Sequence, residues 1–348
     1  MSTATEFPAA GTVTMTFLDA LKNALQTCMR ADQRVVLLGE DIAGGAGQGA
    51  PLEGAMGGTF GVTKGLFEEF GAGRVLDTPI SEAGITAATV GAAMAGLRPV
   101  TDLMWASFAP KAFDEVVNQA AKMRFMSGGQ TSVPMVLRMA VGGGLRAAAQ
   151  HSDTHYALFT NVPGLKVVAP ATPAEARGLL MAAILDNDPV IFLEHMALYT
   201  TSGPVDLSAG PIRLGTLGVL REGSDITIAG VGHAAVTALE AAVELETDGI
   251  SAEVVSLRSL QPLDLDGLVA RVAATGRLVV VEEGPPRCSV ASDVAAQVGE
   301  QLFGQLRAPI GRVTSNHAPV PFSPPLEDAH LPNAGKIVAS ARRAMRRV

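Results

Sequence analysis

The order of apolar segments is the feature that most constrains how this chain can fold. Short β-branched runs such as VVLLGE at 35–40 and RPVTDLMW at 98–105 alternate with Ala-rich stretches of helical periodicity. This alternation is typical of strands joined by crossover helices, which makes neighbouring strands parallel. The sequence therefore predicts an α/β fold with mostly parallel sheets.

The predicted strands fall into two groups. The first lies at 35–40, 74–80, 98–105, 134–140, 165–170 and 189–194, and the second at 225–232, 252–260, 277–284 and 309–315. Apolar periodicity predicts a buried helix at 88–96, an amphipathic helix at 113–125, and helices at 233–245 and 265–274. Two groups of this kind predict two α/β units.

The segment TTSGPVDLSAGPIRLG, between the two groups, has the composition of a linker. We expect an N-terminal tail at 1–13, a first domain at 14–200, a linker at 201–213 and a second domain at 214–348. A chain of 348 residues that is 48% hydrophobic can fill two such cores. The Gly-rich segment 43–58 is too long for a simple turn, which predicts a functional or mobile loop.

Charge and cysteine content exclude several classes of protein. The net charge is −8 and the charged residues are dispersed, so no basic surface for nucleic acid is expected. Cys28 and Cys288 lack the spacing of a disulfide framework or zinc site, which favours the reducing cytoplasm. The longest weakly polar run, 83–97, is shorter than the roughly 20 residues of a membrane span. No membrane partner is expected.

Gly230, Gly232 and Ala235 form GxGxxA between a predicted strand and helix, which is the outline of a dinucleotide-binding turn. A nicotinamide-dependent oxidoreductase is therefore one alternative. Glu253, however, stands at the start of the next strand, whereas ribose recognition requires an acid at the carboxyl end. A tight strand-to-helix turn explains the glycines better.

Glu82 stands where the predicted strand ending in DTPIS passes into a helix of small residues. Ile80 and Ala83 predict apolar surroundings, in which a carboxyl group can keep a proton and donate it. The alternative is a carboxylate that only interacts with the helix dipole.

His151 follows a Gly-rich bend and has polar neighbours, Gln150 and Ser152. Catalytic residues often lie in loops that follow strands, so His151 is a candidate acid or base. The alternative is a histidine with a structural role only. His155 stands four residues later, and a metal pair with His151 stays open, although no third ligand is nearby.

Phe108 lies between a predicted strand and helix, close to Trp105, the one tryptophan in the chain. An aromatic side chain there can stack on a ring ligand or pack in the core. Asp186 and Asp188 in LDNDP indicate a turn before a strand, or a loop whose carbonyls bind a cation.

Together and in this order, these motifs resemble the β subunit of the E1 component of 2-oxo acid dehydrogenase complexes, a thiamine diphosphate enzyme of the transketolase superfamily. The resemblance covers nearly the whole chain and is carried by LLGEDI, GGTFGVTKGL, RVLDTPISE, GAAMAGLRPV, FDEVVNQAAK, AAAQHS, PGLKVVAPATPAEA and VSLRSLQPLD. Within the family, LRAAAQHS and the Gly-rich insertion are most similar to acetoin dehydrogenase β subunits, followed by pyruvate dehydrogenase β subunits. The resemblance implies a pyrimidine-binding domain followed by a transketolase C-terminal domain.

The resemblance also implies roles for the candidate residues. Glu82 would hydrogen-bond N1′ of the cofactor's aminopyrimidine and so promote proton removal from C2 of the thiazolium. Phe108 would stack on the aminopyrimidine, and Ile80 and Met104 would line its pocket. His151 would act as acid or base on the substrate side.

Metals and partners follow from the same resemblance. A monovalent cation such as K⁺ would be held, mostly by main-chain carbonyls, at Met135, Ala183, Ile184, Asp186 and Asp188. The chain has no GDG followed about 30 residues later by Asn, the family signature for diphosphate and Mg²⁺. The resemblance therefore implies that an E1 α subunit supplies both, in an α2β2 heterotetramer. The second domain would mediate subunit contacts and docking to a lipoyl-bearing E2 acyltransferase.

The predicted function is thus cleavage of a C–C bond next to a carbonyl, in acetoin or a 2-oxo acid such as pyruvate, with transfer of the acyl fragment to lipoyl-E2. Alternatives are a pyruvate or branched-chain 2-oxo acid E1 β subunit, an E2-independent thiamine carboligase, and a noncatalytic assembly subunit. Where the family commonly reads QHSQ, this chain reads QHSDTHY. Asp153 therefore either alters substrate preference or, with His155, faces solvent.

Overall fold

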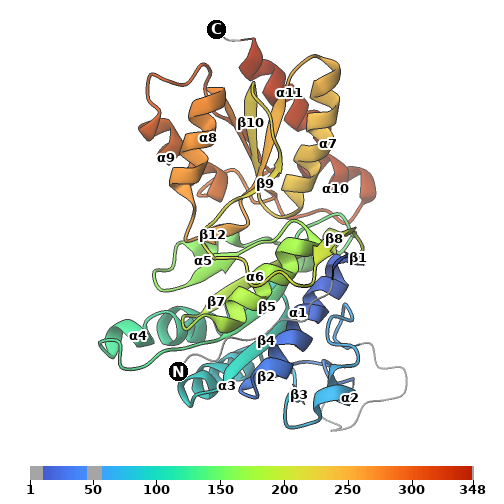
Figure 1. Cartoon of the computed structure of the whole chain (residues 1–348), viewed down its shortest axis with the longest axis vertical. Coiled ribbons are helices and arrows are strands. Elements are labelled where there is room, and N and C mark those ends of the chain that lie inside the picture. The colour runs from blue at the N-terminus through green and yellow to red at the C-terminus, as the bar shows by residue number, and fades with distance from the viewer. Residues whose placement is uncertain (1–10, 45–56, 347–348) are drawn as a thin grey trace.

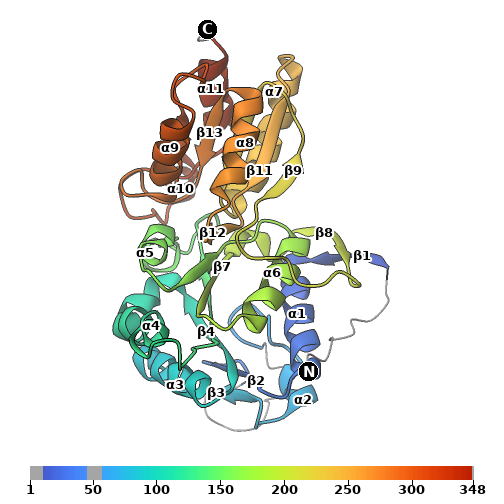
Figure 2. The ribbon, with the colours of Figure 1, turned by 60° about the vertical axis from the view of Figure 1, so that its left-hand side comes forward.

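The structure is a computed structural model that describes residues 11–44 and 57–346. Within these ranges the strands form a seven-stranded, a five-stranded and a two-stranded sheet. Figures 1 and 2 show the two large sheets stacked end to end, each flanked by helices. The α/β class and the mostly parallel pairing predicted from the sequence are confirmed.

The first unit is built on the seven-stranded sheet. In spatial order its strands are β12 (Ser259–Gln261), β6 (Lys166–Val168), β7 (Val190–His195), β5 (Val136–Val141), β4 (Arg98–Trp105), β2 (Val35–Gly39) and β3 (Val75–Asp77). Every pairing is parallel except that of β12 with β6. The six strands predicted for the first group are all present.

Helices cover both faces of this sheet. On one face α1 (Phe17–Ala31) and α6 (Pro173–Leu185) pack together, each begun by a threonine whose side chain caps the first turn. The other face carries α3 (Glu82–Met94), the 3₁₀ segment η1 (Ala106–Ala112), the π-helical segment η2 (Glu115–Ala120), α4 (Met123–Met126) and α5 (Tyr156–Thr160). The single helix predicted at 113–125 is therefore helical but interrupted. Short segments α2 (Leu66–Phe70), η3 (Ala149–His151) and η4 (Met196–Leu198) lie in the connections.

The second unit is built on β14 (Gly311–Val313), β13 (Leu278–Val281), β10 (Ile226–Gly230), β11 (Ala252–Ser256) and β9 (Gly218–Arg221), of which β9 is antiparallel. Alternate side chains point to opposite faces: Ile228 packs against α7 (His233–Thr247) and α11 (Ala334–Met345), and Ala229 faces α8 (Leu265–Thr275) and α9 (Val290–Gln301). Figure 1 shows these helix pairs on the two sides of β10. The unit also contains α10 (Pro324–His330).

Two segments differ from the sequence predictions. The strand predicted at 252–260 divides into β11, and β12, which leaves the second sheet and joins β6 of the first. The predicted linker contains β8 (Ser202–Asp206), which pairs with β1 (Thr12–Thr16) as a two-stranded ribbon. Both differences arise from pairing with distant segments, which local composition does not report.

The helix predicted to be buried at 88–96 corresponds to the end of α3, which is only half covered in this chain. Ile85 and Val90 face the sheet, but Ala88, Gly91 and Met94 are exposed.

Among the described residues, no helix combines the length and the apolar character needed to cross a membrane. The Gly-rich loop predicted at 43–58 lies mostly outside the described residues.

Candidate functional site

A cavity of about 1110 Å³ lies where strand ends from both units converge. Its lining from the first unit follows the carboxyl ends of β2, β3, β4 and β5, and its lining from the second follows β13 and β14. Crevices at the carboxyl ends of parallel strands are the usual ligand sites of α/β folds. Of the sequence-predicted residues, the following line this one cavity: Ile80, Glu82, Met104 and Phe108.

Glu82 is the first residue of α3 and is half-buried at the cavity wall. Ser81 caps the helix without a side-chain hydrogen bond, although its carbonyl accepts from the Ile85 N–H at 2.8 Å. Ile80 lines the cavity but is 74% exposed, so it does not enclose the Glu82 carboxyl in this chain as its sequence neighbourhood predicted.

Glu40, at the end of β2, is a second carboxyl group in the same cavity. Burial raises its pKa, and the negative charges of Asp41 and Glu82 raise it further. Sequence reasoning missed Glu40 as a site residue, although its position directly after the strand VVLLG was a usable signal. The cavity thus brings a protonatable carboxyl group close to Glu82.

The end of β4 is bent where it meets the cavity. Met104 has a left-handed backbone with φ of 61°, and its N–H donates to Asp102 Oδ1 at 2.8 Å. Side chains other than glycine rarely adopt this conformation, and such residues cluster at functional sites. The bend places Met104 and Phe108 on the cavity wall, with the Trp105 and Phe108 rings edge to face at 5.5 Å.

His151 lies in η3 and packs edge-on against the rings of Trp105 and Phe108, at centroid distances of 4.5 and 5.4 Å. It is not among the cavity-lining residues, but its neighbours Gln150 and Ser152 are. The Ser152 hydroxyl is buried and has no hydrogen-bond partner among the described residues. A buried polar atom without a partner at a cavity wall indicates a place that a ligand group or water satisfies.

Asp153 lines the cavity and accepts a hydrogen bond from the Ser107 hydroxyl at 2.9 Å. His155 Nε2 lies 3.7 Å from Asp153 Oδ2, and burial lowers the pKa of His155 while Asp153 offsets part of that effect. His155 therefore pairs with Asp153, and within the described ranges no group of three metal-ligating side chains includes His151 or His155.

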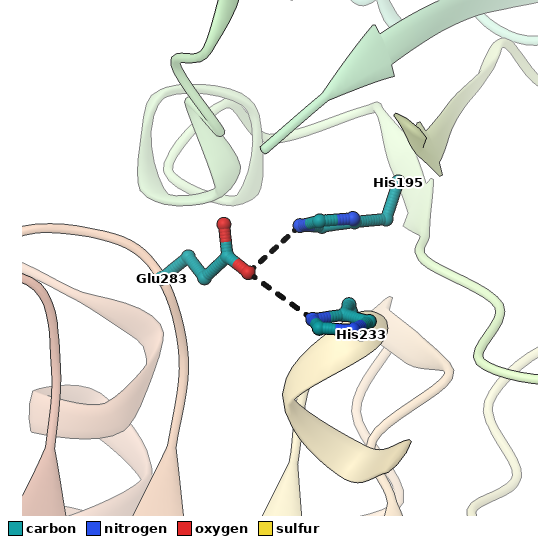
Figure 3. Close-up of side chains that lie close together, drawn as sticks. All are labelled: His195, His233 and Glu283. Atoms are coloured by element: carbon teal, nitrogen blue, oxygen red, sulfur yellow. Dashed lines mark ion pairs between the residues drawn. The ribbon is translucent and has the colours of Figure 1, made fainter. Parts of the chain in front are cut away.

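A cluster that the sequence did not predict joins the two units at the cavity, whose lining includes Glu283. His195 ends β7, His233 begins α7, and Glu283 follows β13. Glu283 Oε1 lies 2.8 Å from His195 Nε2 and 3.5 Å from His233 Nδ1, and the two rings stack at 4.8 Å. Figure 3 shows both rings facing the carboxylate. Burial by itself would raise the pKa of Glu283, but the two histidines outweigh it and hold the pKa below its usual range.

Three of the five positions expected to hold a monovalent cation, Ile184, Asp186 and Asp188, already contact protein cations. The Arg98 guanidinium donates to the carbonyls of Ile184 and Asp186 at 3.0 and 2.8 Å. The Lys166 ammonium lies 2.7 Å from the Asp186 carboxylate and 3.1 Å from that of Asp188. The Arg98 side chain thus occupies two of the carbonyls that the expected K⁺ site would use, and the site stays a prediction from which no chemistry is derived.

The GxGxxA turn is explained by packing. A Cβ at Gly230 would lie 2.4 Å from Ala235 Cα, and Gly232 has φ of 54°. Glu253 is buried and accepts a hydrogen bond from Thr227 Oγ1 at 2.9 Å. A tight strand-to-helix turn therefore accounts for both glycines, and the Glu253 carboxylate is already engaged inside the second unit.

Glu282 provides a test of the electrostatics beside the cavity. Burial raises its pKa to about 7, although it accepts the Ala291 N–H at 2.6 Å. The folded state then keeps a proton that the unfolded state, with a pKa near 4.3, releases, so wild-type stability falls as the pH rises from about 4.5 to about 7. Glu282→Gln has no such loss. We expect it to gain up to about 3 kcal/mol over wild type between pH 4.5 and 8 in urea unfolding. If the variant and wild type differed in unfolding free energy by the same amount at pH 4.5 and at pH 8, the raised pKa of Glu282 would be contradicted.

Comparison with known proteins adds independent information. The family described as "Transketolase, pyrimidine binding domain" matches residues 13–201, and "Transketolase, C-terminal domain" matches residues 215–337. A solved structure of an inactive β4 tetramer of a split-gene transketolase has a TM-score of 0.74 and 23% identity, covering 96% of this chain and 99% of that one. This likeness shows the fold.

Curated relatives are more similar in sequence. The β subunit of acetoin:2,6-dichlorophenolindophenol oxidoreductase from Bacillus subtilis is 51% identical, over 92% of this chain and 94% of its own length. The subunit of the same name from Cupriavidus necator is 50% identical, over 94% and 96%. The β subunit of the pyruvate dehydrogenase E1 component from Rhizobium meliloti is 43% identical, over 96% and 71%.

Proposed function

This chain belongs to the transketolase-like family of E1 β subunits of thiamine diphosphate-dependent dehydrogenases, and we propose that its cavity holds the aminopyrimidine half of that cofactor. The observation that carries the proposal is the convergence of Glu82, Met104 and Phe108 on one cavity at the carboxyl ends of parallel strands. The chain is thus a subunit of an oxidoreductase.

The residues present fit such a ring. Phe108 and Met104 offer apolar surface for stacking, and Glu82 offers a carboxyl group for a ring nitrogen. The unpartnered Ser152 hydroxyl offers a polar group at the same wall. When bound, thiamine diphosphate supplies an electron sink for cleavage of a bond next to a carbonyl.

In this proposal the chain's own residues orient the ring and manage a proton. Glu82 holds or shares a proton at its carboxyl oxygen, and the nearby Glu40 has a pKa raised by burial and by the charges of Asp41 and Glu82. Ile80 completes the wall when a partner subunit covers its exposed face. His151, held between Trp105 and Phe108, serves the substrate side as acid or base.

We propose that the other half of the site belongs to an E1 α subunit. The relatives are named as β subunits, which implies a partner chain. Diphosphate and Mg²⁺ binding would come from that partner, in an α2β2 assembly, with lipoyl-E2 as acyl acceptor. We also propose a first domain at 14–200 and a second at 214–348. The proposed location is the cytoplasm, because the exposed free thiol of Cys288 suits a reducing compartment.

Acetoin is the proposed substrate, because identity is higher to the two acetoin-oxidising relatives, at 51% and 50%, than to the pyruvate dehydrogenase subunit, at 43%. Pyruvate is the second candidate. The test is reduction of 2,6-dichlorophenolindophenol by the chain co-expressed with its α subunit, with acetoin or pyruvate at equal concentration. A higher kcat/KM for acetoin supports the proposal, and a higher value for pyruvate overturns the substrate assignment. Reaction with neither would exclude both.

The same assembly separates the remaining alternatives. Product release without added lipoyl-E2 at the full rate would indicate an E2-independent carboligase. Normal turnover after loss of Glu82 would indicate a noncatalytic assembly subunit.

A further inference from the structure

We propose that the second unit clamps the segment 142–154 through Glu283 and Glu327, and that this clamp positions Gln150 on the cavity wall and His151 against the rings of Trp105 and Phe108. The segment connects β5 to α5 and belongs to the first unit. Its residues 149, 150, 152, 153 and 154 line the cavity. The second unit thereby acts on the active site itself, in addition to any role in assembly.

Two carboxylates of the second unit hold the backbone of this segment where it leaves β5. The Gly143 N–H donates to Glu283 Oε2 at 3.0 Å, and the Gly144 N–H donates to Glu327 Oε1 at 2.9 Å. Arg146 then pairs with Glu327 and lies 2.8 Å from Asp328 Oδ1. The segment is therefore held at successive positions by Glu283 and by residues of α10.

The glycines are required for this approach. Gly142 has φ of 89°, and a Cβ there would lie 1.9 Å from His195 Nε2. A Cβ at Gly143 would lie 3.0 Å from both terminal carbons of Leu331. Only a bend without side chains brings the backbone N–H groups this close to the second unit.

Burial makes the clamp specific for this loop conformation. The Glu283 side chain is 6% exposed and that of Glu327 is 0% exposed. A buried carboxylate is stable only when cations and N–H groups compensate its lost hydration. The loop supplies part of that compensation at both sites, so opening the loop leaves two buried charges poorly satisfied.

The ligand atoms of His195, His233 and Glu283 lie within 4.8 Å of one another, close enough to hold a metal ion, but the hydrogen bonding of His195 opposes metal binding. His195 Nδ1 accepts the Ala197 N–H at 3.2 Å, so Nε2, the atom that faces Glu283, carries a hydrogen. A metal at Nε2 needs that lone pair, with the other ring nitrogen donating instead. The 2.8 Å contact therefore sets this N–H of His195 against the Glu283 carboxylate, although it is not an aligned hydrogen bond.

Hydrogen exchange measured by mass spectrometry on the assembled α/β complex tests the clamp. In Glu283→Ala and Glu327→Ala, amides in the peptide 142–154 should exchange about tenfold faster or more, and the Gln variants, which keep an acceptor, should fall between. Glu253→Ala is the matched control, since Glu253 is also a buried carboxylate of the second unit but contacts Thr227 and Arg271. Unchanged exchange at 142–154, or an equal effect of Glu253→Ala, would overturn the proposal.

Arg146 gives a second test if a Glu327 variant does not fold, because its side chain is 35% exposed. Arg146→Met should speed exchange in 142–154, and Arg146→Lys should restore protection. Equal exchange in the two variants would count against the clamp.

The effect on turnover rests on the proposed function, whereas the exchange measurement does not. Misplacing a positioned group by about 1 Å can cost on the order of 100-fold in rate. We expect the Glu283 and Glu327 variants to lower kcat by about tenfold to 100-fold, because the clamped segment carries Gln150 and Ser152 on the cavity wall. Faster amide exchange in 142–154 without a lower kcat would support the clamp but contradict its link to turnover.

Discussion

Replacing Glu82 with Gln should lower kcat of the assembled complex by about a thousandfold, within the range of 10²–10⁴ for a positioned proton-transfer group. The Gln side chain keeps the size of Glu82 and its place at the start of α3, but it cannot exchange a proton with a ring nitrogen. Steady-state dye reduction and thiamine diphosphate titration of the same preparation measure the two effects separately.

The competing interpretation of Glu82 is a carboxylate that only interacts with the helix dipole, which is worth about 0.3–1 kcal/mol of stability. Asp266 in the first turn of α8 is the matched control, since it is exposed and lies outside the cavity. Asp266→Asn and Glu82→Gln should change stability by similar small amounts, whereas only Glu82→Gln should lose turnover. Full activity of Glu82→Gln would favour the noncatalytic assembly subunit.

The candidate site could be predicted in part because strand ends are visible in the sequence. Ile80 and Glu82 follow β3, Met104 lies at the end of β4 and Phe108 follows it, so a parallel sheet carries all four to one edge. Placing strand ends at one edge requires only the alternation of strands and helices, which the order of apolar segments in the sequence indicates. The left-handed turn at Met104 was not visible, because it depends on the contact of its N–H with Asp102.

The other features depend on pairing between distant segments. His195, His233 and Glu283 come from three elements of two units, and no spacing in the sequence connects them. β8 lies in a segment whose Ser, Gly and Pro content is typical of a linker, and only pairing with β1 makes it a strand. The exposure of Ile80 likewise depends on which surfaces meet, and a partner subunit is the natural cover for this apolar group.

The second large effect should come from Arg138, which is buried in β5. Its Nε and Nη2 atoms donate to the two oxygens of Glu194 at 2.7 and 2.8 Å, and the exposed fractions of the two side chains are 3% and 1%. Arg138→Met would leave the Glu194 charge buried, with Tyr199 as its hydrogen-bond donor at 3.0 Å. We expect a loss of about 3–5 kcal/mol in the free energy of unfolding, measured with urea at fixed complex concentration.

The double variant Arg138→Met/Glu194→Gln separates a stranded charge from lost packing. It removes both charges and leaves an amide for Tyr199, so it should recover most of the lost stability. A double variant as unstable as the single one would show that packing, not charge, dominates.

Activity of the same variants probes the link between this ion pair and the cavity. Arg138 Nη1 lies 3.3 Å from Asp102 Oδ2, and the other oxygen of Asp102 accepts the Met104 N–H. Without Arg138, Asp102 loses the cation that orients it, and the left-handed turn of Met104 loses its restraint. The double variant should therefore recover stability but keep a raised KM for thiamine diphosphate, whereas recovery of both would mean that Asp102 holds the turn without Arg138.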